Sequence, residues 1–337
     1  MLKRLHIYFK ERYPLFARFI LGCIVFLEIH FIILLNYGVT SFRIGIQELV
    51  GAYTGFAFLL WLRVADDLKD FETDKRLFPD RPLPSGRVFK KDIITICVIV
   101  EAIAVVLNII FMNNLLFFCI LYAYGYLMSK WFFQKKRIQP SLPLALITHN
   151  PVQMFVNVYI ISFTVIKYGL KPVSLITIMT LWTLYFPALI WEVSRKIKAP
   201  KDENDYTTYS KLFGYKKSTK FVMILTLVDI VTNMILVFNL NKITIVIFML
   251  LVSWMVWKFV SFMKDPEQYA IVEKVEIYTY IQESLMLLTI VIFLLVGIAS
   301  VLLNVKLYLA DLPLTYLPYS FLVGAGFVNY MRTRNHF

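Results

Sequence analysis

The 337-residue chain has only three cysteines and lacks the short motifs that mark several common enzyme classes. Cys23, Cys97 and Cys119 all lie within apolar runs and have no metal-binding spacing, so we expect neither a disulfide framework nor a cysteine metal site. No His-x-x-x-His, Cys-x-x-Cys, Gly-x-Gly-x-x-Gly, Walker or Ser-His-Asp pattern is evident. A cleavable signal peptide is also not expected, because residues 1–14 are charged and the apolar run from Leu15 has no small-residue cleavage site.

Apolar residues dominate the composition. They make up 59% of the chain, whereas soluble domains have about 45–50%. At about 20 residues per span, the chain can hold roughly eight to ten membrane helices. Backbone polar groups cannot stay unpaired in lipid, so the apolar runs should be helical. We predict an all-α polytopic membrane protein, a single domain over 1–337 with about nine spans near 15–37, 45–64, 92–112, 114–130, 143–166, 172–194, 219–239, 242–263 and 279–304.

The basic residues are distributed unevenly between the loops. Of 35 Lys and Arg, 26 fall in segments on the side of the N-terminus and 5 on the opposite side. The positive-inside rule therefore predicts a cytoplasmic N-terminus and cytoplasmic loops at 65–91 and 192–218. The net charge of +13 then reflects topology, and nucleic acid binding is not expected. Short loops favour a bacterial inner membrane, and residues 315–331 are predicted as an interfacial segment, with a tenth span as the alternative.

Carboxylates interrupt the chain at the end of the second apolar run. Residues 66–74 read Asp-Asp-Leu-Lys-Asp-Phe-Glu-Thr-Asp. If the helix continues, Asp67, Asp70 and Asp74 share one face, where their repulsion calls for cations. Hard oxygen ligands in this number suit Mg²⁺, which takes one or two carboxylates together with substrate phosphates. Basic residues follow at once, which predicts a diphosphate site at the membrane surface.

This region resembles the first aspartate-rich motif of the UbiA superfamily of intramembrane prenyltransferases. That motif reads Asn-Asp-x-x-Asp-x-x-x-Asp with an Arg-Pro-Leu-Pro-Ser-Gly segment soon after; here Asp66 replaces the asparagine and residues 81–86 match the second segment. The resemblance implies membrane helices around a central cavity. It also implies that Mg²⁺ is held by Asp66, Asp67, Asp70 and Asp74.

A second charged cluster follows the sixth predicted span, where the family has another aspartate-rich motif. This chain departs from that pattern, since Glu192 takes the place of the first acid and Arg195 and Lys196 stand where the next acid is expected. One interpretation is that Glu192 holds a second Mg²⁺ with help from a downstream acid, Asp202, Glu203 or Asp205. The other is that Arg195 and Lys196 replace the metal charge and bind the diphosphate directly. Residues 206–214 could form a lid or a simple reverse turn.

Polar residues within the spans are further candidates for function. Asn150, Gln153 and Asn157 have the spacing of one helical face, which could meet a substrate or form interhelical hydrogen bonds. Pro151 predicts a kink beside them. Glu101 and Asp229 are isolated, and partners on neighbouring helices are the favoured explanation. The predicted substrate-binding residues are Asn150, Gln153 and Lys69.

Together these features predict a Mg²⁺-dependent membrane prenyltransferase. By resemblance, it ionises an isoprenyl diphosphate to an allylic cation, which an aromatic or other lipophilic acceptor captures. The residues expected to act on the diphosphate are Arg76, Arg81, Glu192, Arg195 and Lys196. One alternative is a terpene cyclase of the same superfamily, which needs no acceptor; a transporter is the alternative from another class.

Overall fold

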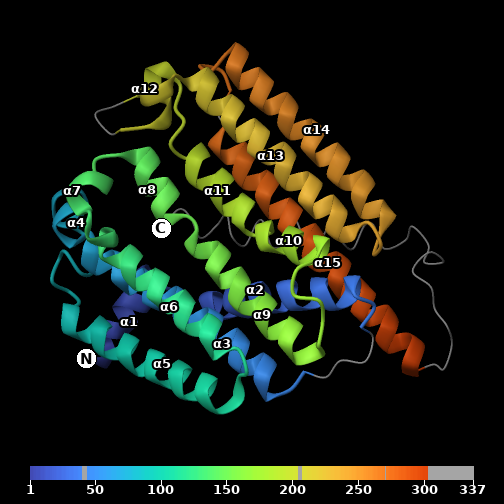
Figure 1. Ribbon diagram of the computed structural model, residues 1–337. Helices are drawn as coiled ribbons and strands as arrows, with labels where there is room; N and C mark the ends of the chain where they lie inside the picture. The colour runs from blue at the N-terminus through green and yellow to red at the C-terminus, as the bar shows by residue number, and fades with distance from the viewer. Residues whose placement is uncertain (40–43, 204–206, 270, 303–337) are drawn as a thin grey trace. The chain divides into compact units, whose positions relative to one another are not determined.

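The computed structural model describes residues 1–39, 44–203, 207–269 and 271–302, and over these residues the chain is built from helices and their connections (Figure 1). Two short 3₁₀ turns, η1 (Trp131–Phe133) and η2 (Pro200–Asp202), lie in the connections. The α-helices are α1 (Leu2–Glu11), α2 (Leu15–Asn36), α3 (Ile46–Lys69), α4 (Phe71–Leu77), α5 (Lys90–Phe111), α6 (Leu115–Ser129), α7 (Lys135–Ile138), α8 (Leu142–His149), α9 (Val152–Tyr168), α10 (Leu175–Trp182), α11 (Tyr185–Ser194), α12 (Tyr209–Phe213), α13 (Tyr215–Val237), α14 (Lys242–Lys264) and α15 (Val272–Leu302).

Eight helical stretches in the described chain are long and apolar enough to cross a membrane. They are α2, α3, α5, α8 with α9, α10 with α11, α13, α14, and α15 up to Leu295. The shorter apolar helix α6 supplies a ninth stretch, where the sequence predicts the fourth span. The predicted all-α polytopic fold is confirmed. The predicted interfacial segment 315–331 lies outside the described residues.

The chain folds into two compact units. One contains the described residues of 1–30 and 41–172, and the other contains the described residues of 31–40 and 173–337. Helix α2 begins in the first unit and ends in the second. The prediction of a single domain over 1–337 stays a prediction.

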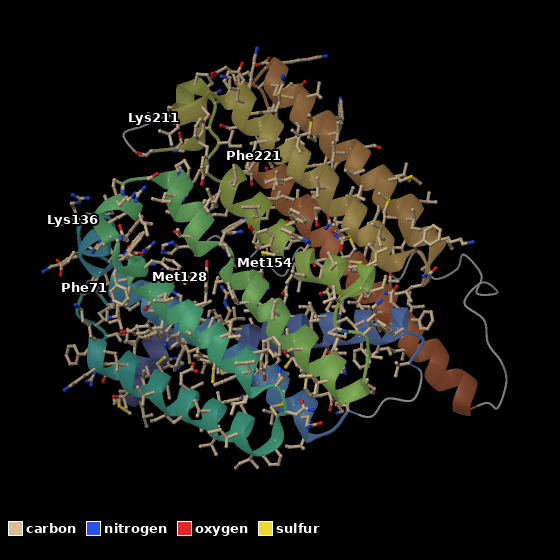
Figure 2. All side chains as sticks on the ribbon, in the orientation of Figure 1. Phe71, Met128, Lys136, Met154, Lys211 and Phe221 are labelled. Atoms are coloured by element: carbon tan, nitrogen blue, oxygen red, sulfur yellow. The ribbon has the colours of Figure 1, made fainter. Side chains whose placement is uncertain are left out.

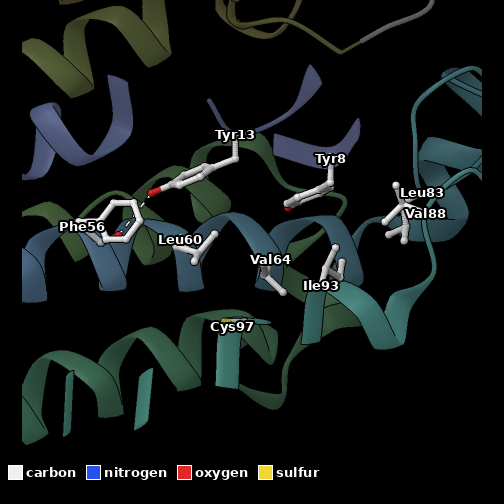
Figure 3. Packing of buried hydrophobic residues seen from close by; sticks show 9 residues of the cluster. All are labelled: Tyr8, Tyr13, Phe56, Leu60, Val64, Leu83, Val88, Ile93 and Cys97. Carbon is white, nitrogen blue, oxygen red and sulfur yellow. Dashed lines mark hydrogen bonds between the residues drawn. The ribbon is translucent and has the colours of Figure 1, made fainter. Parts of the chain in front are cut away.

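The first unit packs its amino-terminal segment against α3 and α5. Tyr8 and Tyr13 reach toward α3, where they join buried side chains of α3, α5 and the 83–88 segment, and the Tyr13 hydroxyl donates to the Phe56 carbonyl at 3.3 Å (Figure 3). Helix α2 approaches α3 so closely that a Cβ on Gly22 would lie 2.7 Å from the backbone nitrogen of Phe56. Small residues allow such approaches between membrane helices. This packing fixes the end of α3 against the chain's first residues.

Buried polar side chains also join helices in this unit. Asn108 of α5 donates to Thr54 of α3 at 2.7 Å and accepts from the Tyr159 hydroxyl of α9 at 2.8 Å. Glu101 of α5 accepts from the Tyr122 hydroxyl of α6 at 2.6 Å, so its predicted partner on a neighbouring helix is confirmed. These bonds satisfy polar groups at membrane depth.

The second unit has α13 at its centre, packed against α10, α11, α14 and α15. Figure 1 shows α13 and α14 running side by side. Asp229 of α13 is fully buried and accepts from Gln282 of α15 at 2.7 Å and from Asn233 at 3.0 Å. The prediction that Asp229 has partners on a neighbouring helix is therefore confirmed.

Candidate functional site

The predicted acidic motif spans the junction of α3 and α4. Helix α3 ends at Lys69, Asp70 adopts φ −99° and ψ 8°, and α4 begins at Phe71. The helical hydrogen-bond pattern nevertheless continues. The Asp70 backbone amide donates to the Asp66 backbone carbonyl at 2.9 Å, and the Asp74 backbone amide donates to the Asp70 backbone carbonyl at 2.8 Å. Asp66, Asp70 and Asp74 therefore follow one another at intervals of one turn.

Two of these three carboxylates already have a cationic partner. Lys69 Nζ contacts Asp66 Oδ1 at 2.7 Å, and Arg81 Nη1 contacts Asp74 Oδ1 at 2.8 Å. The half-buried Asp70 carboxylate makes no hydrogen bond or ion pair within the described part of the chain. Burial raises the pKa of the Asp70 carboxyl; Lys69 opposes the rise, while the negative charges of Asp66 and Asp74 add to it. Asp70 is thus the carboxylate of the motif that most needs a cation.

Asp67 is held differently from its neighbours. Its side chain is 5% exposed, and three residues donate four hydrogen bonds to its two oxygens, including one from Arg63 Nε to Oδ2 at 3.4 Å. Arg12 Nη2 donates to Oδ1 at 2.8 Å, Arg63 Nη2 donates to the same oxygen at 2.5 Å, and the Tyr8 hydroxyl donates to Oδ2 at 2.7 Å. Burial, followed by the Asp67 charge, raises the pKa of the Tyr8 hydroxyl, so Tyr8 stays a donor. We call Asp67, Arg12, Arg63 and Tyr8 the Asp67 cluster.

The donor set of the motif fits a magnesium ion. Among the described residues, no three His, Cys, Asp or Glu side chains gather into a ready-made metal cluster. Mg²⁺ does not require one, because it commonly binds one or two carboxylates and completes its shell with water and substrate phosphates. Asp70, with Asp66 and Asp74 one turn away on each side, offers this chemistry. The oxygens of Asp67 are already engaged, and its predicted metal role stays a prediction.

The basic segment after the motif folds into a tight turn. The Ser85 backbone amide donates to the Arg81 carbonyl at 2.9 Å, and the Val88 backbone amide donates to the Pro82 carbonyl at 3.0 Å. Gly86 has a φ of +76°, a conformation that favours glycine. The Arg81 guanidinium lies over the Phe78 ring, 3.8 Å from its centroid. Arg76 is exposed on α4. The turn therefore brings Arg81 back onto Asp74, whereas Arg76 faces solvent.

Further lysines surround the same end of the first unit. Lys69 Nζ lies 4.8 Å from the Trp131 ring centroid, in addition to its contact with Asp66. Lys135 of α7 acts electrostatically on Asp70. Figure 2 shows Phe71 of α4 and Lys136 of α7 at this end of the unit. The motif is thus set among lysines and arginines that suit an anionic substrate.

The second charged cluster lies at the end of α11, in the second unit. Arg195 Nε donates to Glu192 Oε2 at 2.7 Å, and Lys196 Nζ contacts Glu192 Oε1 at 2.8 Å. We call these three residues the Glu192 cluster. Both oxygens of Glu192 are paired with cations, which supports the interpretation that Arg195 and Lys196 take the place of a metal.

Of the downstream acids, Glu203 is engaged elsewhere, Asp202 is exposed, and Asp205 lies outside the described residues. Glu203 accepts from the Thr208 hydroxyl at 2.8 and 2.9 Å, and Asp202 closes the turn η2. Residues 209–213 form the short helix α12, which begins after its Thr208 cap and ends at Gly214.

The predicted polar face of the fifth span is divided by a helix break. Helix α8 ends at His149 and α9 begins at Val152, so the break predicted at Pro151 is confirmed. Gln153 Nε2 donates to Asn157 Oδ1 at 3.1 Å, and Asn157 is fully buried. Asn150 lies at the end of α8, before the break, so it is not on the same continuous helix as the other two.

A cavity of about 630 Å³ lies between α3, α5 and α6. Trp61, Leu68 and Lys69 line it from α3, Glu101 lines it from α5, and Lys130 follows α6 at its rim. On a helical wheel, the α3 residues of this lining lie on the side opposite Asp70. Lys69 connects this cavity to the acidic motif, because it lines the cavity and also pairs with Asp66.

Sequence reasoning missed three residues of the Asp67 cluster, namely Tyr8, Arg12 and Arg63. One of them carried a signal. Arg63 is a charged residue inside an apolar run, four positions before Asp67, where its side chain can reach the carboxylate. Tyr8 and Arg12 had no such signal, because they are far from Asp67 in the sequence.

Comparisons with known proteins place these features in a family context. The model of the UbiA prenyltransferase family matches residues 26–278. Among solved structures, the chain is similar to one described as "Structural and mechanistic insights into the biosynthesis of Digeranylgeranylglyceryl phosphate synthase in membranes". The TM-score is 0.59 at 17% identity, over 88% of this chain and 99% of that chain. At this identity the likeness shows the fold. No curated protein matches the chain.

Proposed function

The chain belongs to the UbiA prenyltransferase family, and from this premise we propose that it uses Mg²⁺ to transfer an isoprenyl group from an isoprenyl diphosphate to an aromatic or other lipophilic acceptor. The chain is a multi-pass integral membrane protein and a prenyltransferase. We further propose that the N-terminus and both charged clusters face the cytoplasm, which is supported by the uneven distribution of Lys and Arg.

The observation that carries this proposal is the state of Asp70. Its carboxylate is half-buried, lies one turn from Asp66 and one turn from Asp74, and makes no hydrogen bond or ion pair among the described residues, although the charges of Lys69 and Lys135 act on it. Asp70 would hold Mg²⁺ together with Asp66 and Asp74, and Lys69 and Arg81 would then turn from Asp66 and Asp74 toward the substrate. When bound, the metal neutralises charge that develops on the diphosphate.

The basic residues have the role of receiving the leaving group. As the bond between the allylic carbon and the ester oxygen breaks, its electron pair stays on the diphosphate. Arg81 and the exposed Arg76 stabilise this charge, and by their place in the sequence Arg195 and Lys196 are proposed for the same role. Glu192 positions the latter two cations. Asn150 and Gln153 are proposed to bind substrate beside the break at Pro151.

The proposal is tested by measuring diphosphate release in detergent from geranyl, farnesyl and geranylgeranyl diphosphates, with and without Mg²⁺. We expect Mg²⁺-dependent release that requires an added lipophilic acceptor, such as a quinone precursor. Release without an acceptor, accompanied by a cyclic hydrocarbon, would instead identify a cyclase of the same superfamily. Absence of Mg²⁺-dependent release with every donor and acceptor would refute the proposed function.

A further inference from the structure

The Asp67 cluster contains more positive charge than its single carboxylate can neutralise. Two guanidinium groups share Asp67, so the four side chains of the cluster carry a net charge of about +1; the neighbouring Asp66 carboxylate, which is paired with Lys69, also acts electrostatically on Arg63. The side chains of Arg12 and Arg63 are 18% and 31% exposed. Neither arginine makes a second ion pair within the described residues. Partly buried charges are costly without a counter-ion, so this surplus favours the binding of an anion.

The position of Arg63 indicates which anion it meets. Arg63 lies inside the membrane-spanning part of α3, whereas Asp70 lies just beyond its end. The two residues are seven positions apart, two helical turns, and therefore share a face of the helix. The guanidinium reaches Asp67, which is about 4.5 Å from Asp70 along the axis. An isoprenyl diphosphate bound at Asp70, with its apolar chain toward the membrane interior, turns its ester end toward this guanidinium.

The remaining partners of Asp67 allow Arg63 to leave. Arg12 Nη2 on Oδ1 and the Tyr8 hydroxyl on Oδ2 supply one cation and one neutral donor to one carboxylate. That set balances the charge of Asp67 without Arg63. Both partners come from the amino-terminal segment, which is tied to the unit by two further ion pairs, Arg4 with Asp92 and Glu11 with Arg87.

We propose that Arg63 binds the ester-side phosphate of the isoprenyl diphosphate, while Arg12 and Tyr8 act as positioning residues that hold Asp67 when Arg63 turns to the substrate. The inference rests on the proposed function. During ionisation, the electron pair of the broken carbon–oxygen bond stays on the ester oxygen, and the N–H groups of Arg63 stabilise that charge without transferring a proton. The amino-terminal helix is thereby part of the site.

Binding of inorganic diphosphate in the presence of Mg²⁺ tests the inference without turnover. Its affinity for the detergent-purified full chain is measured by calorimetry, and the KM for the isoprenyl diphosphate is measured in parallel. R63Q is expected to weaken diphosphate binding and raise KM by about 10- to 100-fold. R63K keeps the charge but loses the fork, and is expected to recover part of the affinity.

Variants of the amino-terminal helix separate positioning from anchoring. Y8F removes only the hydroxyl that donates to Asp67, so Arg63 is retained there and diphosphate binding falls by about two- to tenfold. E11Q is the matched control, because it breaks an exposed ion pair of the same helix without touching the Asp67 cluster. Its affinity for diphosphate is expected to equal that of the unmodified chain.

The outcomes distinguish this inference from the proposed function. If the unmodified chain releases diphosphate but R63Q binds it as tightly as E11Q does, Arg63 is not a substrate ligand and the inference is wrong. If R63Q does not fold, the affinity of R63K for diphosphate is compared with that of the unmodified chain. An unchanged affinity would also overturn the inference. If the unmodified chain neither binds nor releases diphosphate, the proposed function itself fails.

Discussion

The Asp67 and Glu192 clusters each pair one carboxylate with two cations, but they are built in opposite ways. Glu192 takes both of its partners from the next turn of its own segment, at positions i+3 and i+4. Asp67 takes only Arg63 from its own helix, and Arg12 comes from 55 residues earlier in the chain. One cluster is local, and the other exists only in the folded unit.

Their burial differs as much as their origin. The difference concerns the carboxylates, since Asp67 is 5% exposed and Glu192 is 24% exposed; the partners of Glu192 are 44% exposed at Arg195 and 14% exposed at Lys196. Solvent screens the second cluster, so its ion pairs contribute little to stability. The buried cluster depends on its carboxylate, because removing Asp67 leaves the guanidinium groups of Arg12 and Arg63 without a counter-ion. We therefore expect the Asp67 cluster to stabilise the folded unit as well as to bind substrate. The ion pairs of the Glu192 cluster are expected to exchange more easily for contacts with substrate.

The largest effect on activity is expected from replacing Asp70, the carboxylate of the acidic motif that forms no ion pair among the described residues. Asp70→Asn is predicted to lower Mg²⁺-dependent diphosphate release by about 100-fold or more, since a metal ligand contributes several kcal/mol. Glu192→Gln is the matched change in the second region and is expected to cost less than about tenfold. Equal losses in the two variants would remove the proposed distinction between a metal-binding and a cationic region.

The next effect concerns stability. Asp67→Asn leaves Arg12 and Arg63 without a counter-ion and is predicted to destabilise the folded protein by about 3 kcal/mol. Glu192→Gln breaks pairs that are partly open to solvent and is predicted to cost no more than about 1 kcal/mol. Thermal unfolding in detergent, compared between the two variants, measures this difference. Similar shifts in the midpoint would show that burial does not separate the clusters.

A smaller effect, on the KM for the substrate, tests the role of the Glu192 cluster. Removing both cations in a combined Arg195→Gln and Lys196→Gln variant is predicted to raise the KM for isoprenyl diphosphate by about tenfold. Glu192→Gln frees the same cations and is predicted to leave the affinity for Mg²⁺ unchanged. A marked loss of Mg²⁺ affinity in Glu192→Gln would instead support the interpretation in which Glu192 holds a second metal.

The smallest effect belongs to the exposed pair of Glu11 and Arg87. The Arg87 guanidinium lowers the pKa of the Glu11 carboxyl, so the ionised carboxylate stabilises the folded state. This stabilisation is fully present above the ordinary pKa of glutamate, about 4.3, and is lost as the pH falls through the lowered value. Glu11→Gln is predicted to cost less than about 1 kcal/mol near pH 7. The difference from the unmodified chain should vanish in acid; a difference that persists there would exclude the ion pair as its cause.

Much of the fold could be predicted from the sequence because lipid imposes strong local rules. The nine apolar stretches and the break at Pro151 each follow from composition over one segment. The sequence also predicts that Asp229 and Glu101 have partners on neighbouring helices, without naming those partners. Their identities, Gln282 and Tyr122, depended on which helices pack together.

In the candidate site, too, some features follow from the local sequence and others depend on how the helices pack. The sequence by itself determined where the acidic motif, the basic turn and the Glu192 cluster lie, because each is a run of neighbouring residues. Only the tertiary structure decided that Asp67 is held by Tyr8, Arg12 and Arg63 while Asp70 lacks a cation among the described residues. The physical reason is that spacing along one helix sets which side chains share a face. The packing of α1 against α3 sets which distant charges reach that face.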